Sequence, residues 1–142
     1  REDTVFLAGR EGALLRCKTT GCEFLESGTE ETLHAAALAP DGTLWLAGKS
    51  GVLVRHDGKA GRAVPTGTER DLNALWIAPE GVVYAAGDHG TLLRVAPGAA
   101  GATALALESS EDFDALCGLA ARPGEHELWA AGTGGVIWHY RP

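Results

Sequence analysis

Two of the three cysteines lie close enough in sequence to react with each other. Cys17 and Cys22 flank residues 18–21, a spacing typical of a loop between two antiparallel strands. Across such a loop the two Cα atoms can approach to disulfide distance. The alternative, a metal site with C-x4-C spacing, lacks a second pair of ligands nearby. The spacing predicts a Cys17–Cys22 disulfide, and with it an exported protein (periplasmic, outer-surface or extracellular), because disulfides persist in oxidising compartments.

The other side chains that could take part in catalysis form no recognisable constellation. Cys117 lies in an apolar stretch, which indicates a buried small hydrophobe, and no His and Asn pair points to it as a nucleophile. The five histidines lack metal-ligand spacing. The G-x-S-x-G, H-E-x-x-H, P-loop and dinucleotide-binding motifs are absent from the sequence. We therefore expect no catalytic residue, no metal site and no cofactor.

Polar residues recur at the head of the first strand of a repeated unit and in the turns beside it. The candidate residues of this face are His34, Asn73, Asp114, Lys49, Asp88 and His89. Arranged around a ring, His34, Asn73 and Asp114 would converge near the mouth of the central channel. Together with the neighbouring turns they would form a polar, mostly acidic rim that could bind a cation or a basic segment of a partner protein. The alternative is a solvated loop face, on which the polar residue of the strand caps the preceding turn.

The repeated unit has the pattern apolar, aromatic, x, Ala, Gly, x, x, Gly. The first glycines of its four copies are Gly9, Gly48, Gly87 and Gly132, which are 39, 39 and 45 residues apart. Each copy is followed by an apolar run that ends in Arg or His, and in three copies a second apolar block and a turn signal precede it. We treat residues 1–142 as a single domain with repeats at about 1–31, 32–70, 71–111 and 112–142.

One full unit predicts four short strands, at residues 33–39, 43–47, 52–56 and 62–66. The second and third would be joined by the two residues inside G-x-x-G, which is a hairpin length. Four strands in a unit of about 40 residues are the pattern of a propeller blade. The predicted fold class is therefore all-β: a β-propeller with four repeats of four-stranded antiparallel blades.

Two further positions recur in every copy. The aromatic position holds Phe6, Trp45, Tyr84 and Trp129. Because it lies within an apolar strand, we expect it to pack between blades, and the alternative is a platform for stacking sugars. The basic position at the end of the third strand holds Arg16, Arg55, Arg94 and His139, and we expect ion pairs there.

These motifs resemble those of known propeller families. The repeat is similar to that of the seven-bladed propellers related to Ycf48, which is a photosystem II assembly factor. It is also similar to the WD40/YVTN-like repeats that are common in secreted bacterial lipoproteins. The Gly-His and Trp-Asp pairs of true WD40 repeats do not occur in the sequence, and residues 56–59 (His-Asp-Gly-Lys) retain only part of the Asp-box of the Ycf48 type. The resemblance implies a fold and no activity.

Charge and hydropathy exclude two classes of partner. The formal net charge is −7, and a nucleic-acid-binding protein needs a basic face. The same charge argues against docking on an anionic membrane. No stretch approaches the roughly 18 apolar residues of a membrane-spanning helix, and the chain does not open with a signal peptide. We expect neither nucleic acid nor membrane insertion.

The strand pattern predicts incomplete blades at both ends of the chain. The first repeat starts at its second strand and the last stops at its third. Because the sequence starts with Arg1 and contains no Met, we expect a processed product or a piece of a longer chain. Open ends would expose apolar blade faces, so we expect closure by further chain or by self-association with a second copy.

Three hypotheses about function follow. The preferred one is a non-catalytic propeller scaffold that recognises a protein or peptide, in an exported or surface-associated bacterial protein. The second is a glycan-binding, lectin-like propeller assembled from several short chains. The third is an arc of a propeller enzyme, such as a lyase, whose catalytic residues lie outside this chain.

Overall fold

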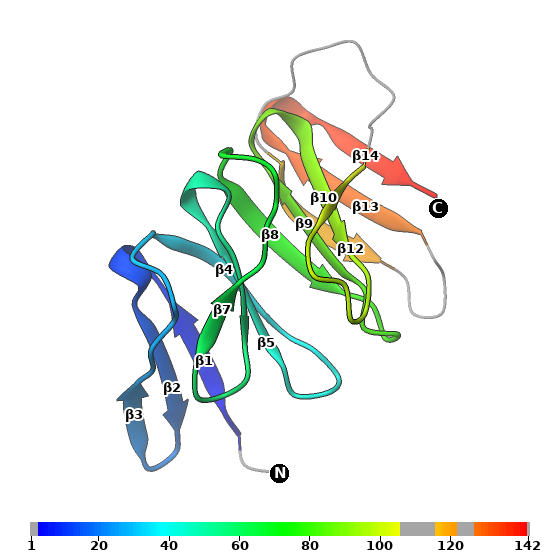
Figure 1. The fold of residues 1–142 in the computed structure, drawn as a ribbon. Coiled ribbons are helices and arrows are strands. Elements are labelled where there is room, and N and C mark those ends of the chain that lie inside the picture. The colour runs from blue at the N-terminus through cyan, green and yellow to red at the C-terminus, as the bar shows by residue number, and fades with distance from the viewer. Residues whose placement is uncertain (1–2, 106–115, 122–126, 142) are drawn as a thin grey trace.

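The computed structural model describes residues 3–105, 116–121 and 127–141. These residues form fourteen strands in four antiparallel sheets. Figure 1 shows the sheets following one another along the chain, with the N-terminus beside the first sheet and the C-terminus beside the last. The prediction of an all-β propeller arc is confirmed.

Consecutive strands pair within each sheet. Sheet 1 consists of β1 (Val5–Ala8), β2 (Leu14–Lys18) and β3 (Gly21–Phe24). Sheet 2 consists of β4 (Leu33–Leu38), β5 (Leu44–Gly48), β6 (Leu53–His56) and β7 (Gly61–Ala63). Sheet 3 consists of β8 (Leu72–Ile77), β9 (Val83–Gly87), β10 (Thr91–Val95) and β11 (Thr103–Ala104). Sheet 4 consists of β12 (Leu116–Ala121), β13 (Leu128–Gly132) and β14 (Ile137–Tyr140).

Sheets 1 and 4 are the incomplete blades. β1 corresponds to β5 and β9, because each of these strands runs into a G-x-x-G turn. Among the described residues, sheet 1 therefore lacks the strand that corresponds to β4 and β8, which we call the inner strand. Sheet 4 has its inner strand, β12, and the described residues contain no fourth strand beside β14.

The turns at G-x-x-G are longer than two-residue hairpins, so that prediction is wrong. Each forms a short 3-10 turn, and these turns are η1 (Arg10–Gly12), η2 (Lys49–Gly51), η3 (Asp88–Gly90) and η4 (Thr133–Gly135). The chain that leads into the next inner strand presses against the second glycine, where a Cβ on Gly51 would lie 2.0 Å from the Thr68 carbonyl oxygen.

In sheets 2 and 3 the second strand, β5 or β9, is buried on both faces because it lies between two other sheets. In β5, Leu44 and Leu46 pack toward sheet 1, whereas Trp45 and Ala47 pack toward sheet 3. Tyr84 packs in the same way between sheets 3 and 4. The prediction that the aromatic position packs between blades is therefore confirmed at these two residues. Trp129 differs, with 38% of its surface exposed, because none of the described residues forms a sheet beyond sheet 4.

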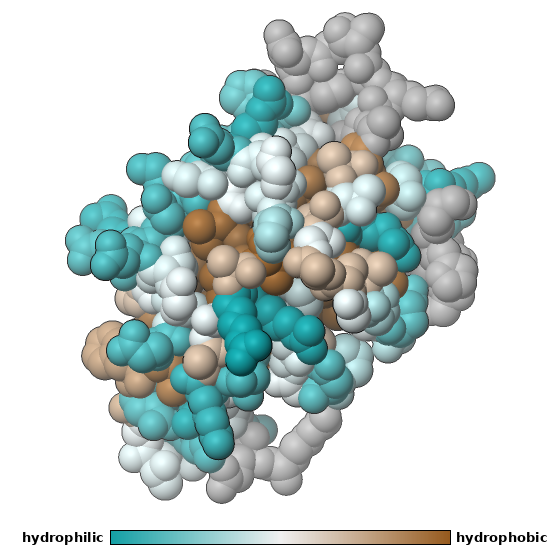
Figure 2. Space-filling model, viewed as in Figure 1, coloured by the Kyte–Doolittle hydropathy of each residue, from teal (hydrophilic) through white to brown (hydrophobic). Residues whose placement is uncertain are grey.

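Both ends of the arc expose apolar side chains. Val5 and Leu7 in β1 are 56% and 52% exposed, whereas Leu44 at the position of Val5 in sheet 2 is 3% exposed. At the other end, Ile137 in β14 is 69% exposed. Figure 2 shows hydrophobic side chains across the middle of this face of the molecule and at its lower left, with hydrophilic side chains between and around them.

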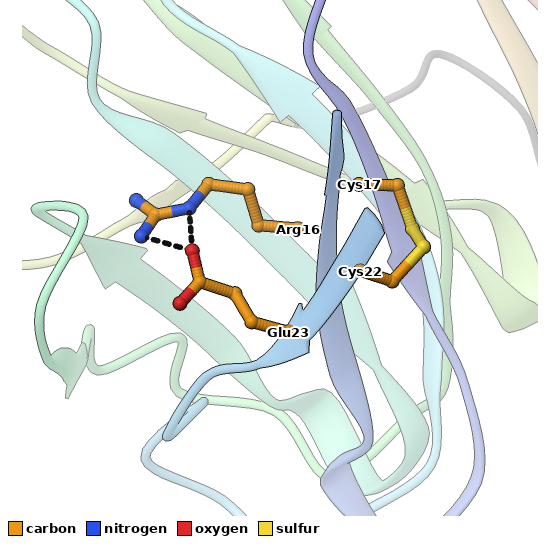
Figure 3. Close-up of a disulfide and its surroundings, with 4 residues drawn as sticks. All are labelled: Arg16, Cys17, Cys22 and Glu23. Atoms are coloured by element: carbon orange, nitrogen blue, oxygen red, sulfur yellow. Dashed lines mark hydrogen bonds and ion pairs between the residues drawn. A yellow bond between two sulfur atoms is a disulfide. The ribbon is translucent and has the colours of Figure 1, made fainter. Parts of the chain in front are cut away.

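The β2–β3 hairpin carries the predicted disulfide. Cys17 and Cys22 are direct partners across the two strands and are bonded, with an S–S distance of 2.08 Å. Lys18 also pairs with Gly21, so the loop is shorter than predicted and consists of Thr19 and Thr20. Figure 3 shows the disulfide on one face of the hairpin and the Arg16–Glu23 ion pair on the other.

Candidate functional site

The inner strands β4 and β8 each begin with a β-bulge. Leu33 pairs with Gly48 and Ala35 with Ala47, which leaves His34 without a partner in β5. In β8, Leu72 pairs with Gly87 and Ala74 with Ala86, so Asn73 is the extra residue of the bulge. A bulge re-aims the side chain of its extra residue. The apolar residues on either side remain in the ladder, and a polar residue is placed at the head of each inner strand.

The two bulge residues meet across the joint between sheets 2 and 3. The Nδ1 atom of His34 lies 3.2 Å from Oδ1 of Asn73, although 39 positions separate the two residues. The Asn73 side-chain amide then donates to Oδ1 of Asp88 in η3, at 2.9 Å. Three of the six predicted face residues are thus brought together, and we call them the His34–Asn73–Asp88 row. Because each side chain of the row hydrogen-bonds to the next, the row connects sheets 2 and 3 through side chains alone.

The segments before the inner strands fix the turns beside this row. The backbone N–H of Ser50 donates to Oδ1 of Asp71 at 2.9 Å, and the Arg70 guanidinium donates to the His89 carbonyl oxygen at 3.3 Å. Ser50 and His89 both have left-handed backbones, with φ of 58° and 55°. Sequence reasoning missed Asp71 and Arg70 as partners of the turns. Their one available signal was a polar residue just before β4 and β8, Thr32 and Asp71.

The remaining predicted residues take different places. His89 and Lys49 are exposed on η3 and η2 and are not members of the row. Asp114 lies outside the described residues. No group of three or more His, Cys, Asp or Glu side chains that could hold a metal ion occurs among the residues that the structure describes.

The register of sheet 4 revises the alignment of the third inner strand. Leu116 pairs with Gly132 and Gly118 with Ala131, so the bulge residue of β12 is Cys117. Cys117, and not Asp114, therefore occupies the position of His34 and Asn73. The distance to the first glycine of the turn was a signal for this strand start, because Leu33 and Leu72 both lie 15 residues before theirs, and Leu116, at 16 residues before Gly132, comes closer to that distance than Phe113, at 19.

The opposite end of sheets 2 and 3 contains a cavity of about 210 Å³. Its polar lining includes Asp41, Arg55 and Glu80. The backbone N–H of Thr43 donates to Asp41 and lowers the pKa of that carboxyl group. In the neighbouring β6–β7 turn, the N–H groups of Ala60 and Lys59 lower the pKa of Asp57 in the same way. These carboxylates are turn-stabilising acceptors, a role that short Asp side chains commonly have.

The basic position makes ion pairs at the two ends of the arc. Arg16 contacts Glu23 on the neighbouring strand of sheet 1. His139 lies 2.8 Å from Glu127 and stacks on Trp129, with ring centroids 4.0 Å apart. The prediction of ion pairs is confirmed for Arg16, and His139 has a carboxylate partner at hydrogen-bond distance. Among the described residues, no helix has the length and apolar character that a membrane span requires.

Comparison with known proteins identifies the fold. The chain is similar to the crystal structure of Sqt1 from Chaetomium thermophilum, a WD40 β-propeller protein, with a TM-score of 0.76. The fold is that of a WD40-like propeller. The two sequences are 21% identical, and the match covers 96% of this chain and 40% of Sqt1, so the chain spans less than half the length of that protein. No protein-family model matches the chain, and neither does any curated protein sequence.

Proposed function

We propose that this chain is a non-catalytic propeller scaffold that binds a protein or peptide on the face formed by η1, η2, η3 and the segments before the inner strands. The His34–Asn73–Asp88 row carries the proposal, because it presents a chain of hydrogen-bonding groups across two sheets. His34 is exposed, and Asn73 and Asp88 are half-buried. A partner can therefore reach groups whose positions are already fixed, which lowers the ordering cost of binding.

The charge of this face favours a basic partner. Its described carboxylates are Glu11, Glu30, Glu31, Glu69, Asp71 and Asp88. Its described basic side chains are Arg10, Lys49 and Arg70. The acidic excess raises the rate of encounter with a basic segment and disfavours acidic ones.

A peptide library displayed on phage tests the proposal, with the immobilised full chain as target. We expect the selected peptides to be rich in Lys and Arg. The best of them should bind the Asp88→Asn variant roughly tenfold more weakly, because one charge-assisted hydrogen bond is lost or weakened. Fluorescence anisotropy of the labelled peptide measures the dissociation constant.

The matched control is Lys59→Ala, an exposed residue of the β6–β7 turn at the opposite end of the sheets. It should leave the dissociation constant unchanged. Equal binding to Asp88→Asn and the unmodified chain, or selection of acidic peptides, would contradict the proposal. Binding to a glycan array would favour the lectin-like alternative, whereas the enzyme alternative requires residues outside this chain.

We further propose that the protein is exported, in a bacterial host. The Cys17–Cys22 disulfide supports this location, because cytosolic thiols are kept reduced. A count of free thiols in the protein from its native source tests the point. One free thiol is expected, that of Cys117, and three would contradict export. A closer relation to the Ycf48-type propellers stays a prediction.

A further inference from the structure

The donors and acceptors of the His34–Asn73–Asp88 row can be assigned from its charged end. An ionised carboxylate only accepts hydrogen bonds, so the group 2.9 Å from Asp88 is the amide nitrogen of Asn73. The side-chain oxygen of Asn73 is thereby directed toward His34, whose Nδ1 lies 3.2 Å away. Because an amide oxygen also only accepts, the Nδ1 atom of His34 must carry a hydrogen.

This order of donors fixes the tautomer of His34. A neutral imidazole has a single N–H, so a hydrogen on Nδ1 leaves Nε2 as an acceptor. The reverse order would place the side-chain oxygen of Asn73 against the Asp88 carboxylate, which is repulsive at this distance. The negative charge of Asp88 therefore selects the Nδ1–H form of His34 through Asn73.

The Nε2 atom of His34 is available to a partner. The side chain is exposed, and it belongs to the extra residue of the β4 bulge. Among the described residues, no group hydrogen-bonds to Nε2. Because Asn73 holds the ring at Nδ1, a partner meets an acceptor whose direction is already fixed.

We infer that His34 selects the partner of this face, with Nε2 accepting a hydrogen bond from a Lys or Arg side chain of a basic segment. The inference rests on the proposed function and names the residue that determines its specificity. A charged donor makes a stronger hydrogen bond than a neutral one, so the contact adds to the attraction of the acidic face. A carboxylate at the same point would meet a second acceptor and be disfavoured.

Protonation of His34 reverses this preference. An imidazolium donates through both nitrogens, so the hydrogen bond to Asn73 is kept, whereas Nε2 becomes a positively charged donor. A Lys or Arg side chain is then repelled. Because the bond at Nδ1 exists in both states, pH acts on the contact with the partner and not on the row itself.

The groups around His34 leave histidine as the source of such a pH effect. The elements packed against β4 include β1, β5 and β8, which have no titratable side chain, and η1. The segments before β4 and β8 contribute Glu, Asp and Arg side chains, which keep their charge between about pH 5 and 8, where histidines change theirs. The charged side chains of η1, η2 and η3 are Arg10, Glu11, Lys49 and Asp88, and His89 in η3 is the other histidine among the described residues of the face.

The tautomer is tested by NMR on the free, 15N-labelled full chain at about pH 8, where neutral histidines predominate. Couplings between ring hydrogens and ring nitrogens distinguish Nδ1–H from Nε2–H. We expect Nδ1–H for His34, and for the exposed His89 mainly the Nε2–H form that free imidazoles favour. Asn73→Ala removes the acceptor and should return His34 to Nε2–H. An Nε2–H form of His34 in the unmodified chain would overturn the inference.

The contact is tested with Lys- and Arg-rich peptides without histidine, selected on the full chain at about pH 8. Fluorescence anisotropy should show roughly tenfold weaker binding at about pH 5, because one charge-assisted hydrogen bond is lost. His34→Gln supplies an uncharged acceptor that does not titrate, so its binding should be close to that of the unmodified chain at the higher pH and equal at both. His34→Leu supplies no acceptor and should bind roughly tenfold more weakly at the higher pH.

The matched control is His89→Asn, which should keep the pH dependence. Equal affinity at the two pH values in the unmodified chain, or a pH dependence that persists in His34→Gln or disappears in His89→Asn, would overturn the inference. Each of these results would leave basic-peptide binding, and so the proposed function, in place. Failure to select any basic peptide would instead overturn both. If a His34 variant has a lowered thermal midpoint, the tautomer and the pH dependence of the unmodified chain still decide.

Discussion

At the scale of single residues, His56 connects two sheets through both of its ring nitrogens. It is fully buried, and its Nε2 lies 3.0 Å from the Glu26 carbonyl oxygen in the segment that leaves sheet 1. Its Nδ1 accepts a hydrogen bond from the N–H of Gly58 in the β6–β7 turn. The imidazole thus fixes a turn of sheet 2 against the preceding sheet, with a donor and an acceptor that no aliphatic residue supplies.

We expect His56→Leu to destabilise the chain by about 2 kcal/mol, because a backbone donor and acceptor lose their partner on the loss of the ring. The urea midpoint of unfolding measures the effect. His89→Asn is the control, since His89 is exposed and asparagine tolerates its left-handed backbone. Equal midpoints for the two variants would show that the hydrogen bonds of His56 contribute nothing to stability.

At the scale of elements, the G-x-x-G turns were recognisable from sequence and their conformation was not. The glycines predicted a turn between two strands, and each copy has one. The approach of Thr68 to Gly51 is a contact between segments 17 residues apart, which no local pattern reports. The start of the third inner strand was misplaced in the sequence alignment for a related reason. Phe113 and Leu116 are both apolar residues that could begin a strand, and the pairing of Leu116 with Gly132 decides between them.

Two glycines of these turns provide a matched prediction. Gly51 and Gly135 have nearly the same left-handed backbone, with φ of 73° and 77°, so an alanine at either costs about 1–2 kcal/mol in conformational energy. Only at Gly51 does the new methyl group meet a carbonyl oxygen, and nothing lies within 4 Å at Gly135. We expect Gly51→Ala to lose at least about 2 kcal/mol more than Gly135→Ala, measured by urea unfolding. Equal losses would mean that the backbone angle alone determines the cost.

The β2–β3 hairpin provides a prediction of its own. Its disulfide closes a short loop, and the entropic account assigns about 2 kcal/mol to such a closure. The Cys17→Ser, Cys22→Ser double variant should therefore lower the thermal midpoint. Reductant should lower the midpoint of the unmodified chain to the same value and leave the double variant unchanged. A reductant effect on the double variant would point to another cause.

At the scale of the whole molecule, the side chains that form the core between neighbouring sheets have counterparts in the first and last sheets, and those counterparts are exposed. Leu7 is 52% exposed, whereas Leu46 at the same position in sheet 2 is fully buried. Ile137 is 69% exposed, and Leu53 at its position in sheet 2 is 1% exposed. The two ends are also complementary, because every internal joint packs one such face against the other. Because the exposed apolar face at one end of the chain is complementary to the face at the other end, head-to-tail contact between two copies is favoured.

We therefore expect self-association that strengthens with concentration, detected as a rise in sedimentation coefficient above that of the 14.7 kDa chain. Leu7→Lys and Ile137→Lys each place a charge in one of the complementary faces, and either variant should keep the chain monomeric over the same range. Both should unfold at the same urea concentration as the unmodified chain, since neither side chain is buried. Leu46→Lys places the same charge inside the core and should prevent folding, which separates loss of association from loss of structure. A chain that stays monomeric at every concentration, with or without the lysines, would show that the end faces do not recognise each other.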